Sequence, residues 1–134
     1  MICFPNSKLN IGLFVTGKRE DGYHNLETVF YPLAVNDVLE VVAASVTRLF
    51  ISGISIAGEQ DTNLVWKAYQ NLSAMFPGKI PAMEIYLHKL IPMGAGLGGG
   101  SADGAFMLKL MNDFCGLGLS ASGQGLRCGP SASP

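Results

Sequence analysis

The stretch that decides the fold is residues 92–103, which read Pro92-Met93-Gly94-Ala95-Gly96-Leu97-Gly98-Gly99-Gly100-Ser101-Ala102-Asp103. Five glycines fall within seven positions of it, although glycine loses more conformational entropy on folding than any other residue. Such a cluster is typical of a loop whose backbone approaches a ligand closely. If Ser101 caps the helix predicted to follow, free backbone N–H groups and the positive end of the helix dipole face one point. The stretch therefore predicts an anion site, most often a phosphate site. The alternative is a flexible linker, against which the apolar flanks argue.

Composition, net charge and cysteine spacing limit the classes of protein to which this chain can belong. The chain has 134 residues, the size of one domain, and its apolar content of 49% with only 14% charged residues indicates that part of its surface is normally covered. A net charge of −1 gives no basic surface for nucleic acid, and every apolar run is too short to cross a membrane. Three widely spaced cysteines favour a reducing compartment, with the cytoplasm as the default, and show neither metal-ligand spacing nor a disulfide framework.

Hydrophobic periodicity predicts an α+β domain with a mainly antiparallel sheet and helices on one face. In the first strand, alternation places Lys8 and Asn10 on one face and an apolar row on the other. Asp61 or Thr62 can cap the first helix, and glycines end the second. The expected strands are 8–18, 23–33, 37–43, 48–54 and 82–91, the expected helices are 64–76 and 101–115, and the apolar row is Leu9, Ile11, Leu13 and Val15.

The last fifteen residues differ in kind from the rest, since eleven of them are Ser, Gly, Ala or Pro. They show no periodicity and no apolar run, which is typical of irregular or disordered chain. We therefore expect a domain over residues 1–119 and a separate tail over residues 120–134.

The glycine stretch is neither a P-loop, which needs a lysine before its Ser/Thr, nor a dinucleotide fingerprint in its usual βαβ context. Residues 92–101 instead resemble the ATP-phosphate loop of the GHMP kinase superfamily, P-x-G-x-G-L-G-S/G-S/G-S. Within that superfamily, residues 8–10 (KLN) and 21–26 (DGYHNL) resemble the family that phosphorylates the cytidine-diphosphate ester of methylerythritol. Residues 61–64 and 89–101 nearly repeat two further motifs of that family. The resemblance covers about residues 5–119.

This resemblance implies a fold and a reaction. The fold would be the GHMP kinase N-terminal domain, which is ribosomal protein S5 domain 2-like. The reaction would transfer the γ-phosphoryl group of ATP to the 2-hydroxyl of the methylerythritol moiety, a step of the non-mevalonate (MEP) isoprenoid pathway. ATP and Mg²⁺ are the implied cofactors, and a small molecule, rather than nucleic acid or a membrane, is the implied partner.

The resemblance also implies roles for individual residues. Lys8 would lie near the nucleophilic hydroxyl and the γ-phosphate, where negative charge develops. Asn10 would orient the substrate, Tyr23 would stack on cytosine and His24 would hydrogen-bond its edge. Asn63, Leu64 and Lys89 would lie near the adenosine, and the phosphates of ATP would be held by Pro92, Gly94, Gly96, Gly98, Gly99, Gly100 and Ser101.

The chain departs from the family pattern at two points. Family members are about twice as long and carry a later segment resembling G-A-D-V-P-F, whose Asp is the general base, whereas this chain has no acidic residue after Asp113. We therefore expect an incomplete domain with little or no activity alone. Asp103 stands where many members have Asn, and its charge would repel phosphates unless Mg²⁺ or a lysine intervenes.

Two other functions remain open at this point. The chain could come from another GHMP kinase with a different small alcohol as its substrate. It could instead be a non-catalytic nucleotide-binding or interaction fragment.

Overall fold

The computed structural model describes residues 1–56, 58 and 60–120, so the predicted tail at 120–134 lies outside the described residues except for Ser120. None of the helices in this described part is long and apolar enough to cross a bilayer. The elements in chain order are β1 (Ile2–Cys3), β2 (Asn6–Lys18), β3 (His24–Asn36), β4 (Val38–Ala43), β5 (Arg48–Gly53), the 3₁₀ helix η1 (Gln60–Thr62), α1 (Leu64–Met75), β6 (Met83–Lys89) and α2 (Gly99–Cys115).

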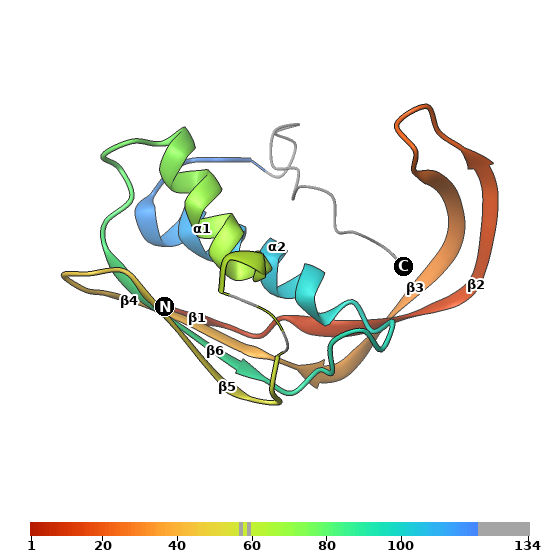
Figure 1. Ribbon diagram of the computed structural model, residues 1–134, viewed down its shortest axis with the longest axis horizontal. Helices are drawn as coiled ribbons and strands as arrows, with labels where there is room; N and C mark the ends of the chain where they lie inside the picture. The colour runs from red at the N-terminus through yellow and green to blue at the C-terminus, as the bar shows by residue number, and fades with distance from the viewer. Residues whose placement is uncertain (57, 59, 121–134) are drawn as a thin grey trace.

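Two sheets make up the strand framework (Figure 1). The first has the order β1-β4-β6-β5, with β5 parallel to β6 and the other two pairings antiparallel. The second is the antiparallel hairpin of β2 and β3, which extends away from the first sheet as an arm. The predicted α+β class with a mainly antiparallel sheet is confirmed. The strands expected at 37–43 and 48–54 both form, although β6 lies between them in the sheet.

Helices α1 and α2 pack against each other and cover one face of the four-stranded sheet (Figure 1). The sheet turns alternate residues of β6 toward them, because successive side chains of a strand point to opposite faces. The core between these layers is entirely aliphatic or thioether in character. Its buried members are Leu39, Val41, Val65, Ala68, Leu72, Met83, Ile85, Leu87, Met107, Leu108, Leu110 and Met111.

Both helix starts differ from their predicted caps. Asn63, rather than Asp61 or Thr62, is the N-cap of α1, and its side-chain oxygen accepts a hydrogen bond from the Val65 N–H at 2.9 Å. Residues 60–62 instead form η1, so the N-cap of α1 is the next residue along the chain. Helix α2 begins at Gly99 with Gly98 as its N-cap and no side-chain cap.

Ser101 therefore lies inside the first turn of α2 and does not cap it. The reason is close packing at the start of the helix. A Cβ atom on Gly99 would lie 2.7 Å from Cγ2 of Ile91, so only glycine lets the helix begin against the end of strand β6. Gly116 ends the helix in the left-handed conformation, as predicted.

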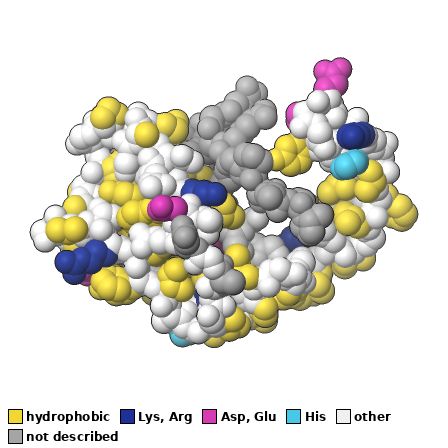
Figure 2. Space-filling view, in the orientation of Figure 1, with side chains coloured by type: hydrophobic (Ala, Val, Ile, Leu, Met, Phe, Trp, Pro, Cys, Tyr) yellow, Lys and Arg dark blue, Asp and Glu magenta, His cyan; other side chains and the backbone are white. Residues whose placement is uncertain are grey.

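The β2–β3 arm does not have the single apolar face that alternation predicts. Gly12 has φ of +65° and forms a bulge, so Ile11 and Leu13 oppose the neighbouring residues Val29 and Thr28. Neighbouring pairs of a ladder point to opposite faces, and the apolar row is therefore divided between the two faces. Figure 2 shows apolar side chains gathered along the arm. Those between 42% and 68% exposed are Leu9, Ile11, Leu13, Phe14, Val15, Leu26, Val29, Phe30, Tyr31 and Val35.

We expect Gly53→Ala to destabilise the fold more than Gly22→Ala, although both glycines have φ near +85°. A Cβ atom at Gly53 would lie 2.2 Å from the backbone oxygen of Lys89, whereas nothing lies within 4 Å at Gly22. The strained conformation alone costs about 1 kcal/mol, and the backbone clash should bring the cost at Gly53 to about 3 kcal/mol. Urea unfolding of both variants measures this difference. Equal losses of stability would show that β5 and β6 can separate at no cost.

Candidate functional site

The glycine loop joins the end of β6 to the start of α2. Gly94, Gly96 and Gly98 have φ of +74°, +74° and +70°, a region of backbone conformation that side chains other than glycine's rarely adopt. Pro92 and Ser101 are exposed at the two ends of the loop. Because no side chain caps α2, the first N–H groups of the helix are left for another hydrogen-bond acceptor.

Strand β2 brings Lys8 against this loop. The Lys8 backbone N–H donates to the Leu97 carbonyl at 2.9 Å, and its ammonium donates to Gly96 O at 3.4 Å and to Asn10 Oδ1 at 2.9 Å. A Cβ atom on Gly98 would lie 2.8 Å from Cε of Lys8, so the lysine stem occupies the space beside the loop. Lys8 and Asn10 therefore share one face, as predicted, and that face meets the glycines.

A buried ion cluster lies beneath the loop. The Lys89 ammonium is fully buried and donates to Oδ2 of Asp37 and, at 2.7 Å, to Oδ2 of Asp103. Asp37 Oδ1 accepts from the N–H groups of Leu90 and Ile91 at 2.6 and 2.9 Å. The family resemblance predicts that Lys89 lies near an adenosine. That stays a prediction, and the structure adds that the ammonium is held by two carboxylates.

The two carboxylates of this cluster titrate in opposite directions. Burial raises the pKa of Asp103 to about 7, against the opposing hydrogen bond and charge of Lys89, and the neighbouring charge of Asp37 adds to the rise. Burial also acts on Asp37, but there it is outweighed by hydrogen bonds from Lys89, Ile91 and Leu90, which lower the pKa of that carboxyl group. Lys89 thus helps to keep Asp37 ionised, whereas the pKa of Asp103 lies at about 7 despite its bond to the same lysine.

A cavity opens beside the first turn of α2 and encloses about 540 Å³, counting space open to solvent. Two of the residues predicted near an adenosine, Asn63 and Leu64, lie in its wall together with Gly100 from the loop. The remaining lining residues are Ile51, Ile56, Gly58, Gln60, Thr62, Met93 and Asp103.

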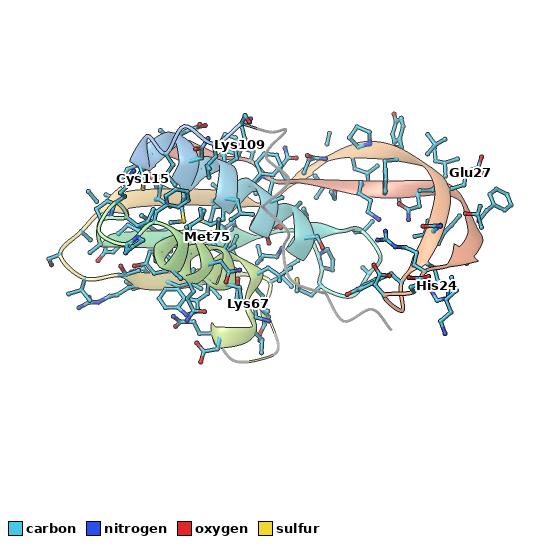
Figure 3. All side chains as sticks on the ribbon, turned by 90° about the horizontal axis from the view of Figure 1, so that it is seen from above. His24, Glu27, Lys67, Met75, Lys109 and Cys115 are labelled. Carbon is cyan, nitrogen blue, oxygen red and sulfur yellow. The ribbon has the colours of Figure 1, made fainter. Side chains whose placement is uncertain are left out.

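Tyr23 and His24 lie at the tip of the β2–β3 arm, where Lys18 pairs with His24. Lys8 is ten residues earlier on β2, at the base of the arm. Figure 3 shows His24 at the far end of the hairpin, away from the labelled residues of the two helices. The structure thus gathers Lys8, Asn10 and the glycine loop at one place, and it leaves Tyr23 and His24 at another.

Asp37 is the residue of this site that the sequence did not single out. The sequence pattern predicts it only as the first residue of a strand, whereas in the structure it precedes β4 and binds the Lys89 ammonium. A signal for it exists, since Lys89 continues the buried alternation of Met83, Ile85 and Leu87. A lysine on a buried face requires a carboxylate nearby, and Asp103 and Asp37 are the two that the fold supplies.

No group of three or more His, Cys, Asp or Glu side chains within residues 1–56, 58 and 60–120 is arranged to hold a metal ion. The carboxylates nearest the loop, those of Asp37 and Asp103, are turned toward Lys89.

The chain is similar to known kinases over most of its length. Residues 63–127 match the family model described as the GHMP kinases N terminal domain. The chain is 59% identical over 117 residues to the 4-diphosphocytidyl-2-C-methyl-D-erythritol kinase of Parabacteroides distasonis, a match that covers 87% of this chain and 42% of that relative. It is 52% identical over 122 residues to the kinase of the same name from Cytophaga hutchinsonii, covering 91% of this chain and 44% of the relative.

The chain is also similar in structure to a kinase of this kind. The crystal structure of a 4-(cytidine 5'-diphospho)-2C-methyl-D-erythritol kinase superposes with a TM-score of 0.71 at 33% identity, covering 90% of this chain and 42% of that one. The expected GHMP kinase N-terminal fold is therefore confirmed. The chain spans less than half the length of the relatives that it matches.

We expect the free energy of unfolding to decrease as the pH rises from 5 to 8. Because the folded-state pKa of Asp103 lies above its ordinary value, the folded chain binds more protons than the unfolded chain in this window. Asp37, whose pKa is lowered, loses its contribution only at more acidic pH, and the pKa of the nearby Cys3 thiol is raised to about 11. Urea unfolding at each pH measures the slope.

Asp103→Asn should remove this slope, because the amide does not ionise. Asp113→Asn is the matched control, since Asp113 is exposed on the same helix, and it should leave the slope unchanged. A slope that persists in Asp103→Asn would mean that another group titrates.

Proposed function

We propose that this chain, which has the fold of the GHMP kinase N-terminal domain, is the ATP-binding part of a 4-diphosphocytidyl-2-C-methyl-D-erythritol kinase. The observation that carries the proposal is the meeting of the Lys8 ammonium with an uncapped, glycine-rich helix start. Both features attract the same anion, and together they favour the polyphosphate of a nucleotide.

The phosphates would bind at the loop and the first turn of α2. The N–H groups at a helix start carry partial positive charge and lack intrahelical partners, which phosphate oxygens can supply. Glycines at positions 94, 96, 98 and 100 keep this surface free of side chains, whereas the buried Gly99 packs on Ile91. The exposed Ser101 hydroxyl is available to the same ligand. Mg²⁺ would arrive with ATP and share the phosphate charge, since Mg²⁺ in such sites is bound largely through substrate phosphates.

Phosphoryl transfer depends mainly on positioning and on stabilising charge as it develops. The bond between the phosphorus of the γ-phosphoryl group and its bridging oxygen breaks, and a bond from the substrate 2-hydroxyl oxygen to that phosphorus forms. Lys8, held by Asn10 and by the Gly96 carbonyl, would place its positive charge beside the transferred group. Asn10 would orient the acceptor on the same face of β2.

The adenosine would occupy the cavity next to the loop. Asn63 and Leu64 lie in its wall at the start of α1, and Gly100 connects this wall to the phosphate loop. Apolar side chains from Ile51, Ile56 and Met93 offer a surface for a flat base. The buried Lys89 would contribute from below the loop rather than by direct contact, because its ammonium is held by Asp37 and Asp103.

The cytidyl end of the substrate would be recognised at the arm, with Tyr23 stacking on cytosine and His24 hydrogen-bonding its edge. The relatives extend well beyond the matched part, and the exposed apolar side chains of the arm suit a surface that this further part covers. We propose that the same part supplies the general base that takes the hydroxyl proton. A reducing compartment such as the cytoplasm fits this assignment.

We expect this chain alone to transfer phosphoryl groups slowly or not at all, since it would lack the base. A chimera that joins residues 1–119 to the remaining part of the Parabacteroides distasonis kinase should phosphorylate the cytidyl substrate with ATP and Mg²⁺. In that chimera, Lys8→Ala should lower kcat about 100-fold or more, because one charge on the transferred group is lost, and change KM for ATP far less. Steady-state kinetics measures both constants.

Lys79→Ala is the control for this experiment, because Lys79 is an exposed lysine in the turn after α1. It should leave both constants near those of the unsubstituted chimera. Normal turnover by the isolated chain would contradict the assignment of the base, and an unchanged kcat in Lys8→Ala would remove Lys8 from the reaction.

A further inference from the structure

The buried ion cluster joins three parts of the chain that are far apart in sequence. Lys89 is the last residue of β6, Asp37 lies between β3 and β4, and Asp103 lies near the start of α2. All three are at most 3% exposed. The ammonium donates to one oxygen of each carboxylate, so it ties the end of a strand to the start of a helix.

The cluster encloses the two ends of the glycine loop. On the β6 side, Asp37 accepts from the N–H groups of Leu90 and Ile91, the two residues that lead into the loop. On the α2 side, Asp103 holds the helix through the same lysine. Between them, Gly99 packs on Ile91, and a Cβ atom there would lie 3.4 Å from the Lys89 Nζ.

We propose that Asp37, Lys89 and Asp103 are positioning residues that fix the two ends of the glycine loop relative to each other. The consequence for ATP rests on the proposed function, whereas the effect on the loop does not. Two backbone hydrogen bonds connect α2 to the loop and the loop to β2. The Ala102 N–H donates to Gly98 O and the Lys8 N–H donates to Leu97 O, each at 2.9 Å. The lysine beneath the loop thereby also sets where Lys8 meets it.

The charges of the cluster indicate that it holds the loop ends in place rather than adding to the stability of the fold. Two carboxylates share one ammonium, and the second oxygen of Asp103 has no hydrogen-bond partner within the described chain. A buried carboxylate in that situation contributes little to stability, while removing one partner of a one-to-one pair is costly. Removing Asp103 would leave the balanced pair of Lys89 and Asp37 and should not unfold the chain.

Asp103→Ala is therefore the informative variant, and Asp103→Asn is its conservative partner, because an amide oxygen can still accept from Lys89. Amide hydrogen exchange of the full chain without nucleotide reads the loop directly. We expect the Lys8 and Ala102 amides to exchange about tenfold faster in Asp103→Ala than in wild type. In Asp103→Asn both rates should return close to those of wild type. The amides of Ile85 and Leu87, within β6, should not change in either variant.

Asp113→Ala is the matched control on the exposed side of α2 and should change none of these rates. A uniform increase over the chain in Asp103→Ala, or no change at Lys8 and Ala102, would overturn the positioning role. Calorimetry measures the affinity of each variant for Mg–ATP. Asp103→Ala should weaken this binding about tenfold, and Asp103→Asn should weaken it much less. If wild type does not bind Mg–ATP while the exchange pattern holds, the proposed function fails and the positioning role stands.

Discussion

A buried lysine has to be neutralised, and this requirement organises the structure around Lys89. Its side chain lies at 0% exposure at the end of β6, where only carboxylates brought by other elements can compensate its charge. Asp37 lies between β3 and β4, and Asp103 lies near the start of α2. The three side chains therefore tie the end of β6 to the first turns of α2.

The site follows from that constraint. With both of its ends fixed, the glycine loop presents an uncapped helix start at the junction between the helix-covered sheet and the β2–β3 arm. Strand β2 passes this junction, and its Lys8 binds the loop through both backbone and side chain. Positive charge is thus concentrated at one place by two elements that are distant in sequence, which is the arrangement that a polyphosphate requires. The arm then extends from the same junction toward Tyr23 and His24.

Local features of the fold could be predicted from the sequence, because they depend on neighbouring residues. The alternation in β6, the periodicity of α1 and α2 and the shared face of Lys8 and Asn10 are of this kind. Features set by distant contacts could not. The place of β6 between β4 and β5 results from long-range strand pairing. The start of α2 at Gly99 depends on packing against Ile91. Asp37 binds Lys89, which is 52 positions away in the sequence. The bulge at Gly12, which divides the apolar row of the arm, also depends on the register with β3.

We propose that the glycine loop, together with Lys8, binds the phosphates of ATP. The most direct test is a titration of the isotope-labelled chain with Mg–ATP, followed by NMR of its backbone amides. We expect the amide signals of residues 94–101 and of Lys8 to shift together with a single dissociation constant, while those at the tip of the arm around His24 do not shift. Binding that shifts signals elsewhere and leaves the loop unchanged, or no shift at millimolar Mg–ATP, would show that the loop and Lys8 do not bind the phosphates.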